Sequence, residues 1–348
     1  MSVPSRQLAP GVARVWPVLL LAGLFVPMPK MASAGRPALD LTYSPTGKEG
    51  LRYQFMGPQA LDMGDQTALL AVLLEAQTNL AAGKAELQDA SVASDTAQLV
   101  DDINAVTSND ARDAESSLSF MFRTSWASLC RRLGGGTGGS ALAQRREQLT
   151  RLASLRVQVG RDDQGAPAPS AGETLLSFRE AGRGQLSVTL GAWLTSAVRG
   201  ERYARIDFAE RQALPSDIAR AAHAFFCGVL GTRRSLPIGL ETLCRRIWPE
   251  HDKAPEATRR RRRSDVRAAL AAIEHLQGWQ VMTRRGDVFE VTRSEHGDAK
   301  GRNASANAKP KRPVAAVSSL VDEALPSLSP EAFSALFAEL ALDAAIAR

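Results

Sequence analysis

Five consecutive arginines, Arg259–Arg263, open a segment whose apolar residues follow a helical period. Steps of three and four residues predict an α-helix over Thr258–Gly278 with one buried stripe. The stripe consists of Val266, Ala269, Leu270, Ile273 and Leu276. The neighbouring face carries Arg260, Arg263, Ser264 and Arg267. Such closely spaced like charges destabilise an isolated helix, and helix N-terminal amides attract phosphate, so the pattern favours a polyanionic partner. A solvated charged face without a ligand is the alternative.

A basic hairpin is expected directly after this helix. Trp279 and Val281, then Phe289 and Val291, predict two short strands that turn at residues 284–287. The turn contains Arg284 and Arg285. A helix with a buried side and an arginine side, followed by a basic hairpin, is typical of the recognition half of a winged helix-turn-helix, which binds DNA.

An earlier part of the chain predicts a second, less basic version of this arrangement. Thr124 or Ser125 is expected to cap a helix over Trp126–Leu133, and a second helix is expected over Ala141–Leu155. A hairpin should then begin at Val157 and Val159, pass through the loop 162–171 and return over Leu175–Arg179. The segments LCRRL (129–133) and LCRRI (243–247) precede the two basic helices and indicate an internal repeat.

The order of these patterns predicts an α+β chain with two tandem winged-helix domains. The first domain is expected over residues 36–183, with an acidic insertion at 84–116, and the second over 184–293. Residues 294–312 are polar and basic enough to predict a disordered linker. Residues 313–348 predict a C-terminal amphipathic helix.

The N-terminal residues 1–35 are apolar and are expected to form a poorly ordered leader or extension. Val15–Pro27 follows a basic start and precedes small residues, as in a signal peptide. The run is short for a membrane span and contains prolines. A DNA-binding helix downstream argues against export, so we interpret the segment as a leader that is not cleaved.

Neither the composition nor the motifs predict a catalytic site or a metal-binding site. The net charge is +6, and its concentration in a few elements favours nucleic acid. The three cysteines stand singly in apolar helical patterns and are expected to be buried free thiols. The glycine-rich segment 134–139 satisfies GxGxxG but follows a helix rather than a strand, so a dinucleotide site is not expected. We therefore predict a protein that is not an enzyme and needs no metal or cofactor.

Several segments together resemble the replication protein C family, the replication initiators of IncQ-type plasmids. The resemblance extends from about Leu21 to Arg293. The segments that carry it, in order, are LAGLF (21–25), LDLTY (39–43), MGPQAL (56–61), GQLSVTLGAWLTSAV (184–198), ARIDFAERQAL (204–214), ETLCRRIWP (241–249), and RRRRRSDVRAAL followed by GWQV. In the family pattern Leu21–Phe25 lies close to the start, which implies that residues 1–20 are an extension or follow a misassigned start codon.

The resemblance implies tandem winged helices that bind directly repeated iterons in a plasmid origin and help to open the adjacent duplex. The implied partners are double-stranded DNA and a plasmid-encoded helicase and primase, with a homodimer also possible; the location is the cytoplasm, without a membrane. A winged-helix transcriptional repressor is the main alternative, and an exported or membrane-tethered protein is another. The residues expected to contact DNA are Arg259, Arg260, Arg261, Arg262, Arg263, Ser264, Arg267, Arg284 and Arg285 in the second domain, and Arg123, Arg145, Arg146 and Arg151 in the first.

Overall fold

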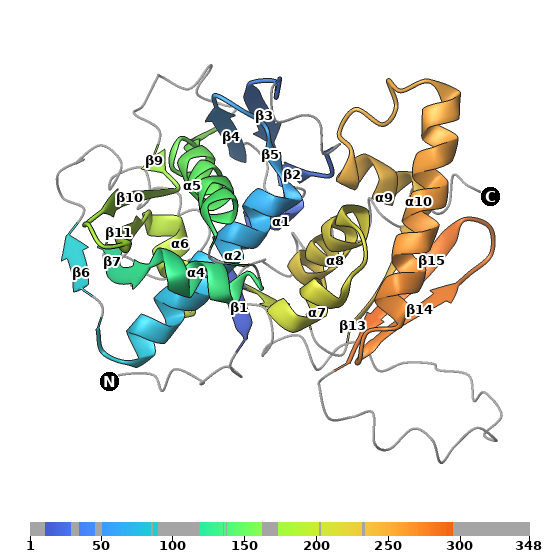
Figure 1. Cartoon of the computed structure of the whole chain (residues 1–348). Helices are drawn as coiled ribbons and strands as arrows, with labels where there is room; N and C mark the ends of the chain where they lie inside the picture. The colour runs from blue at the N-terminus through green and yellow to red at the C-terminus, as the bar shows by residue number, and fades with distance from the viewer. Residues whose placement is uncertain are drawn as a thin grey trace, which may run out of the picture. The chain divides into compact units, whose positions relative to one another are not determined.

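Contacts within the chain divide it into two units, residues 1–208 and 209–348 (Figure 1). The structure is a computed structural model that describes residues 11–28, 35–45, 51–84, 86–89, 118–134, 136, 138–161, 173–201, 203–231 and 234–294. The expected linker and C-terminal helix, beyond residue 294, lie outside these described residues, as does most of the expected acidic insertion.

A long helix, α2 (Met63–Ala81), forms the centre of the first unit. Asp62 caps its N-terminus in a capping box with Asp65, each carboxylate accepting the other residue's backbone N–H. Every residue from Ala68 to Ala76 is buried. A helix that is apolar on all sides is favoured only where other elements surround it, which explains its place in the core.

One sheet of this unit has the strand order β10-β11-β7-β6. Its strands are β6 (Glu86–Asp89), β7 (Leu118–Ser125), β10 (Leu176–Glu180) and β11 (Gln185–Leu190). Phe120, Phe122 and Val188 alternate inward and are buried. Helix α4 (Trp126–Arg132) follows β7 directly and is capped by the Ser125 side chain, as the sequence predicts. Helix α5 (Gly139–Ala153) comes next.

A second sheet of the first unit has the order β3-β4-β8-β9. Strands β3 (Leu39–Tyr43) and β4 (Leu51–Gly57) form an antiparallel hairpin, as the alternation of apolar and polar residues in LDLTY and LRYQF predicts. Strand β8 (Arg156–Arg161) pairs with β4 on one side and with the short β9 (Glu173–Thr174) on the other. Helix α6 (Ala192–Arg199) follows β11 and ends at Gly200 in the left-handed conformation.

The expectation of a poorly ordered N-terminal leader is wrong for residues 12–26. Strand β1 (Val12–Val15) pairs with β12 (Ala204–Asp207), and β2 (Phe25–Val26) pairs with β5 (Leu61–Asp62). Between them, α1 (Pro17–Leu21) is a short, largely buried helix. The apolar run is therefore core of the first unit, because its side chains are covered by elements distant in sequence. No helix among the described residues is long and apolar enough to span a membrane.

The second unit begins within α7 (Phe208–Ala213). Helix α8 (Asp217–Val229) is capped by Ser216, as a serine just before an apolar helical pattern predicts, and packs against α10 (Glu256–Glu274). Strand β13 (Arg234–Gly239) leads into α9 (Leu240–Ile247), and α10 leads into the hairpin of β14 (Trp279–Thr283) and β15 (Val288–Arg293). The sheet order is β13-β15-β14. Figure 1 shows this hairpin beside α10, with which β14 is in contact.

Both units contain a helix, a strand, two helices and a hairpin in the same order, with β6, β8 and β9 inserted in the first unit. The elements are α2, β7, α4, α5 and β10–β11 in the first unit, and α8, β13, α9, α10 and β14–β15 in the second. In each, the first strand pairs with the second strand of the hairpin. The first residue of the following helix also donates its backbone N–H to a carbonyl of the hairpin turn, Trp126 to Gly184 over 3.0 Å and Leu240 to Asp287 over 2.8 Å. The repeat that LCRRL and LCRRI indicate is thus present in the described structure, and the chain has a mixed α+β fold.

The hairpin of the first unit is a different one from that predicted. We expected it to start at Val157 and to return over Leu175–Arg179. Strand β8, however, pairs with β4 in the other sheet, and the hairpin that pairs with β7 is β10–β11. The division between units at 208 also differs from the expected boundary at 183, because β11, α6 and β12 belong to the first unit.

Candidate nucleic-acid interface

Helix α10 has one apolar face and one polar face. Val266, Ala269, Leu270 and Ile273 are buried, as the periodicity predicts. Arg260, Arg261, Ser264 and Arg267 are exposed. The exposed side chains lie about one turn apart, so they form a continuous stripe along the helix surface.

The remaining arginines of the run hold the N-terminal half of α10 in place. Arg263 donates to Glu241 of α9 and, over 2.9 Å, to Glu256 at the start of its own helix. The buried His251 contacts the other oxygen of Glu241 at 2.8 Å. Arg259 pairs with Glu256 at 2.7 Å, and the Arg262 guanidinium lies 5.1 Å from the centre of the Trp248 ring. These side chains are half-buried and already occupied, so they contribute less to an open DNA surface than the exposed stripe does.

The carboxylates around Arg263 are stabilised in their charged form. Partial burial alone would raise the pKa of Glu241, but the hydrogen bonds from Arg263 and His251 hold this pKa below its ordinary value. The hydrogen bonds that Arg263 donates to Glu241 and, second, to Glu256 raise the pKa of Arg263. Glu241 and Arg263 are therefore both charged at neutral pH, and their ion pair holds α9 and α10 together.

The hairpin turn continues the exposed stripe of α10. Arg267 donates to the Asp287 carboxylate in the turn over 2.8 Å, and this contact joins the helix to the hairpin. Arg284 pairs with Glu290 of β15. Arg285 is exposed, and neither it nor Arg260 makes a side-chain hydrogen bond or ion pair with any described residue. Exposed ion pairs contribute about 0–1 kcal/mol, so a phosphate could replace the carboxylate partners at little cost.

In the first unit, the predicted contact residues do not form a comparable stripe. Arg146 makes a bidentate pair with Glu180 of β10, both bonds 2.9 Å long, and its guanidinium lies 5.7 Å from the Trp126 ring centre. Arg145 donates to the Gln148 side chain. Arg123 is exposed on β7, away from α5. The structure brings Arg145 and Arg146 together on α5 but leaves Arg123 on the sheet.

The expectation that Arg151 points outward, where it could contact DNA, is wrong. Arg151 is 7% exposed, donates to both oxygens of the buried Asp65 and pairs with Glu147. Its place among polar residues of α5 suggested an outward direction. The side chain instead points to the capping box of α2, because Asp65 there requires a cationic partner in the protein interior.

Two exposed arginines that the sequence reasoning missed lie on the hairpin of the first unit. Arg179 is on β10, and Arg183 is at the turn, where it has a φ of 48° between Gly182 and Gly184. Arg183, like Arg284 and Arg285 of the β14–β15 hairpin, lies at the hairpin turn. The signal for this hairpin is the glycine-flanked turn AGRG (181–184) between the alternating segments LSFRE and QLSVTL.

The titratable residues offer no alternative chemistry. All three cysteines are buried free thiols, as predicted. Within the described ranges, no cluster of three or more His, Cys, Asp or Glu residues could hold a metal ion. The cationic surface of α10 and its hairpin is therefore the feature on which a functional assignment can be based.

A comparison with known protein families gives a match over most of the chain. Residues 12–295 match the family model described as Replication protein C (RepC). The chain belongs to the RepC family. The match begins at β1, so it includes the N-terminal segment that the sequence reasoning had set apart, and it ends just after the β14–β15 hairpin.

Solved structures and curated proteins give more distant information. A crystal structure of domains 2 and 3 of RctB superposes with a TM-score of 0.43 and 10% identity, covering 79% of this chain and 96% of that one. A second structure of RctB domains 2–3 gives a TM-score of 0.40 and 11% identity, covering 80% and 96%. No curated protein matches the sequence.

Proposed function

We propose that this RepC-family chain is a plasmid replication initiator that binds double-stranded DNA and reads its sequence with α10. The observation that carries the proposal is the exposed stripe of Arg260, Ser264 and Arg267, joined through Asp287 to the basic hairpin turn. Arginine suits bidentate contact with guanine in the major groove, and an arginine on the hairpin suits the adjacent phosphates.

The proposal treats both units as winged helices. The succession of elements and the sheet orders support this interpretation, with α10 as the recognition helix of the second unit and α5 in the equivalent position of the first. By resemblance to initiators of IncQ-type plasmids, the DNA would consist of direct repeats, or iterons, in the origin. Binding would then promote opening of an adjacent A·T-rich segment.

The remaining parts of the role follow from the same resemblance. The protein would act in the cytoplasm without catalytic activity of its own, and a plasmid-encoded helicase and primase would load at the opened site, whether the initiator binds as a monomer or a homodimer. A winged-helix repressor would share these structural features and is the second candidate.

The test is a footprinting and gel-shift experiment on the DNA beside the gene. We expect protection of tandem direct repeats. Arg260→Ala and Arg267→Ala should each weaken binding to a repeat by about 1–3 kcal/mol and reduce discrimination against altered repeats. Arg156→Ala is the matched control, because Arg156 is an exposed arginine on β8, outside the proposed interface.

The outcomes separate the two candidates. Protection of one palindrome would favour the repressor. Equal affinity of the wild-type protein for repeats and scrambled DNA would contradict sequence reading, and unchanged binding by both α10 variants would remove this helix from the interface.

A further inference from the structure

The arginines of α5 are all engaged with other side chains of the first unit, whereas α10 carries in Arg260 an exposed arginine with no side-chain partner among the described residues. Arg146 is held by Glu180, Arg151 by Asp65 and Glu147, and Arg145 by Gln148. If Arg151 turned outward, the buried Asp65 carboxylate would lose a cationic partner. The first unit therefore lacks the feature that supports base reading by α10.

Three other exposed arginines of this unit lie on or beside the outer face of the β10-β11-β7-β6 sheet. Strand register places Arg179 of β10 opposite Ser187 of β11, and Ser187 opposite Arg123 of β7. Residues directly opposite each other in adjacent strands share one face, so the two arginines flank Ser187 on the side away from the buried Phe122 and Val188. Arg183 lies at the turn of the same hairpin. None of these three arginines makes a side-chain hydrogen bond or ion pair among the described residues.

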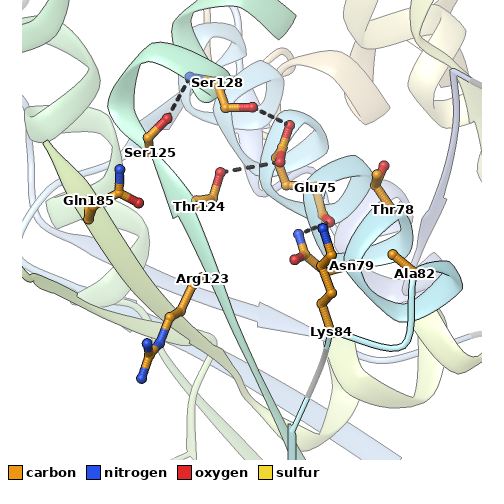
Figure 2. A pocket seen from close by; sticks show the side chains of 10 residues that line it. All are labelled: Glu75, Thr78, Asn79, Ala82, Lys84, Arg123, Thr124, Ser125, Ser128 and Gln185. Atoms are coloured by element: carbon orange, nitrogen blue, oxygen red, sulfur yellow. Dashed lines mark hydrogen bonds between the residues drawn. The ribbon is translucent and has the colours of Figure 1, made fainter.

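A polar pocket of about 310 Å³ lies beside this surface, between the end of α2 and β7 (Figure 2). Its cationic residues are Lys84 and Arg123, and Asn79 and Gln185 add amide groups. In Figure 2 the Lys84 side chain extends toward Asn79, and the Arg123 side chain extends from the strand on the opposite side of the pocket. Lys84 is exposed and, like Arg123, has no side-chain partner in the described part of the chain.

The acidic residue of the pocket does not cancel these charges. Glu75 accepts hydrogen bonds from Thr124 over 3.2 Å, from Ser128 over 2.9 Å and from Arg132. Its carboxylate is therefore neutralised by Arg132 and saturated by hydroxyl groups. The two remaining charges of the pocket, on Lys84 and Arg123, are both positive.

We propose that the first unit holds the sugar–phosphate backbone of DNA through this cationic surface (Lys84, Arg123, Arg179 and Arg183), while sequence is read by the second unit. The inference rests on the proposed function. It assigns backbone binding to the first unit and sequence reading to the second. No aromatic side chain lines the pocket, so base stacking has no platform there, whereas arginine, lysine and side-chain amides all donate to phosphate oxygens.

The salt dependence of binding tests the proposal. The double variant Lys84→Gln and Arg123→Gln is compared with the wild-type protein on an origin repeat and on scrambled DNA of equal length. Each lost phosphate contact lowers the slope of log Kobs against log salt concentration by roughly 0.9, so the double variant should lose about 1.8. We expect the same loss on both DNAs and an unchanged ratio of specific to non-specific affinity.

A slope change below that of one contact, or a loss of affinity confined to the origin repeat, would overturn the proposal. Arg156→Gln on β8 is the control for a general loss of positive charge and should leave the slope unchanged. Since neither the Lys84 nor the Arg123 side chain has a partner among the residues that the structure describes, thermal unfolding of the double variant should match the wild type. Failure of the wild-type protein to bind any DNA would instead refute the proposed function itself, so the two failures are distinguishable.

Discussion

At the scale of single residues, an arginine contacts phosphate only if its guanidinium can leave its partners within the protein. Arg260 is exposed and has no side-chain partner among the described residues. Arg151 is 7% exposed and hydrogen-bonded to a buried aspartate. Burial raises the pKa of Asp65, and the hydrogen bond from Arg151 opposes that rise, so the arginine favours the charged form of the carboxylate.

Replacing Arg151 should therefore destabilise the fold without changing the DNA interface. Removing the sole partner of a buried charge costs about 3–5 kcal/mol; Arg36 also donates to Asp65, over 3.1 Å, so we expect Arg151→Ala to lower the thermal unfolding midpoint by less than that cost implies but still clearly. The affinity of the folded fraction for DNA should stay unchanged. Arg146→Ala, which breaks an exposed pair, is the control and should change stability by less than about 1 kcal/mol. If the Arg151→Ala protein is well folded but binds DNA weakly, Arg151 contacts DNA.

At the scale of elements, a buried polar cluster fixes the hairpin of the second unit to its helices. One Glu210 oxygen on α7 accepts from the Trp279 indole N–H over 3.1 Å and lies 3.0 Å from His223 Nε2 on α8. Trp279 is the first residue of β14, so the cluster positions the base of the hairpin. Although burial alone would lower the pKa of His223, the neighbouring Cys227 and Glu210 raise it to about 9.

This cluster predicts a loss of stability at alkaline pH. A histidine whose pKa rises from 6.5 to about 9 on folding stabilises the protein fully below pH 6.5, and the contribution is lost as pH increases through 9. We expect the unfolding midpoint of the wild-type protein to fall over this window. His223→Gln should be less stable at pH 6.5 and should show a weaker pH dependence. Parallel pH profiles for the two proteins would show that His223 stays neutral in the fold.

At the scale of the molecule, the N-terminal segment is part of the first unit and pairs with a strand near the end of that unit. Strand β1 pairs with β12, so the start of this unit is joined to its end. Trp16, which is 5% exposed, stacks on Trp193 of α6 with 4.7 Å between ring centres. The segment therefore contributes both backbone pairing and aromatic packing to the core.

Truncation of this packing should be costly. Trp16→Ala removes a large buried side chain, and we expect it to reduce the free energy of unfolding by about 3–5 kcal/mol. Met282→Ala serves as the comparison, because Met282 is 44% exposed and should contribute little. A chain lacking residues 1–20 should be destabilised further, since β1 and most of α1 would be missing. A truncated protein as stable as the full chain would show that residues 12–20 are dispensable for the fold.

The sequence by itself determined the elements whose signal is local. The helical stripe of α10, the Ser125 and Ser216 caps and the β3–β4 hairpin depend on spacings within about twenty residues or fewer. They are present as predicted. The exposed face of α10 was predictable for the same reason, because a helix with one apolar stripe turns its other residues outward.

Only the tertiary structure decided which partner each element takes. Strand β8 could have paired with β7 or with β4, and Arg151 could have faced solvent or Asp65. The apolar residues of 12–26 could equally have formed a leader or a core. Strand pairing and burial depend on residues far away in the chain, and local spacing carries no information on which of several compatible surfaces lies closest after folding.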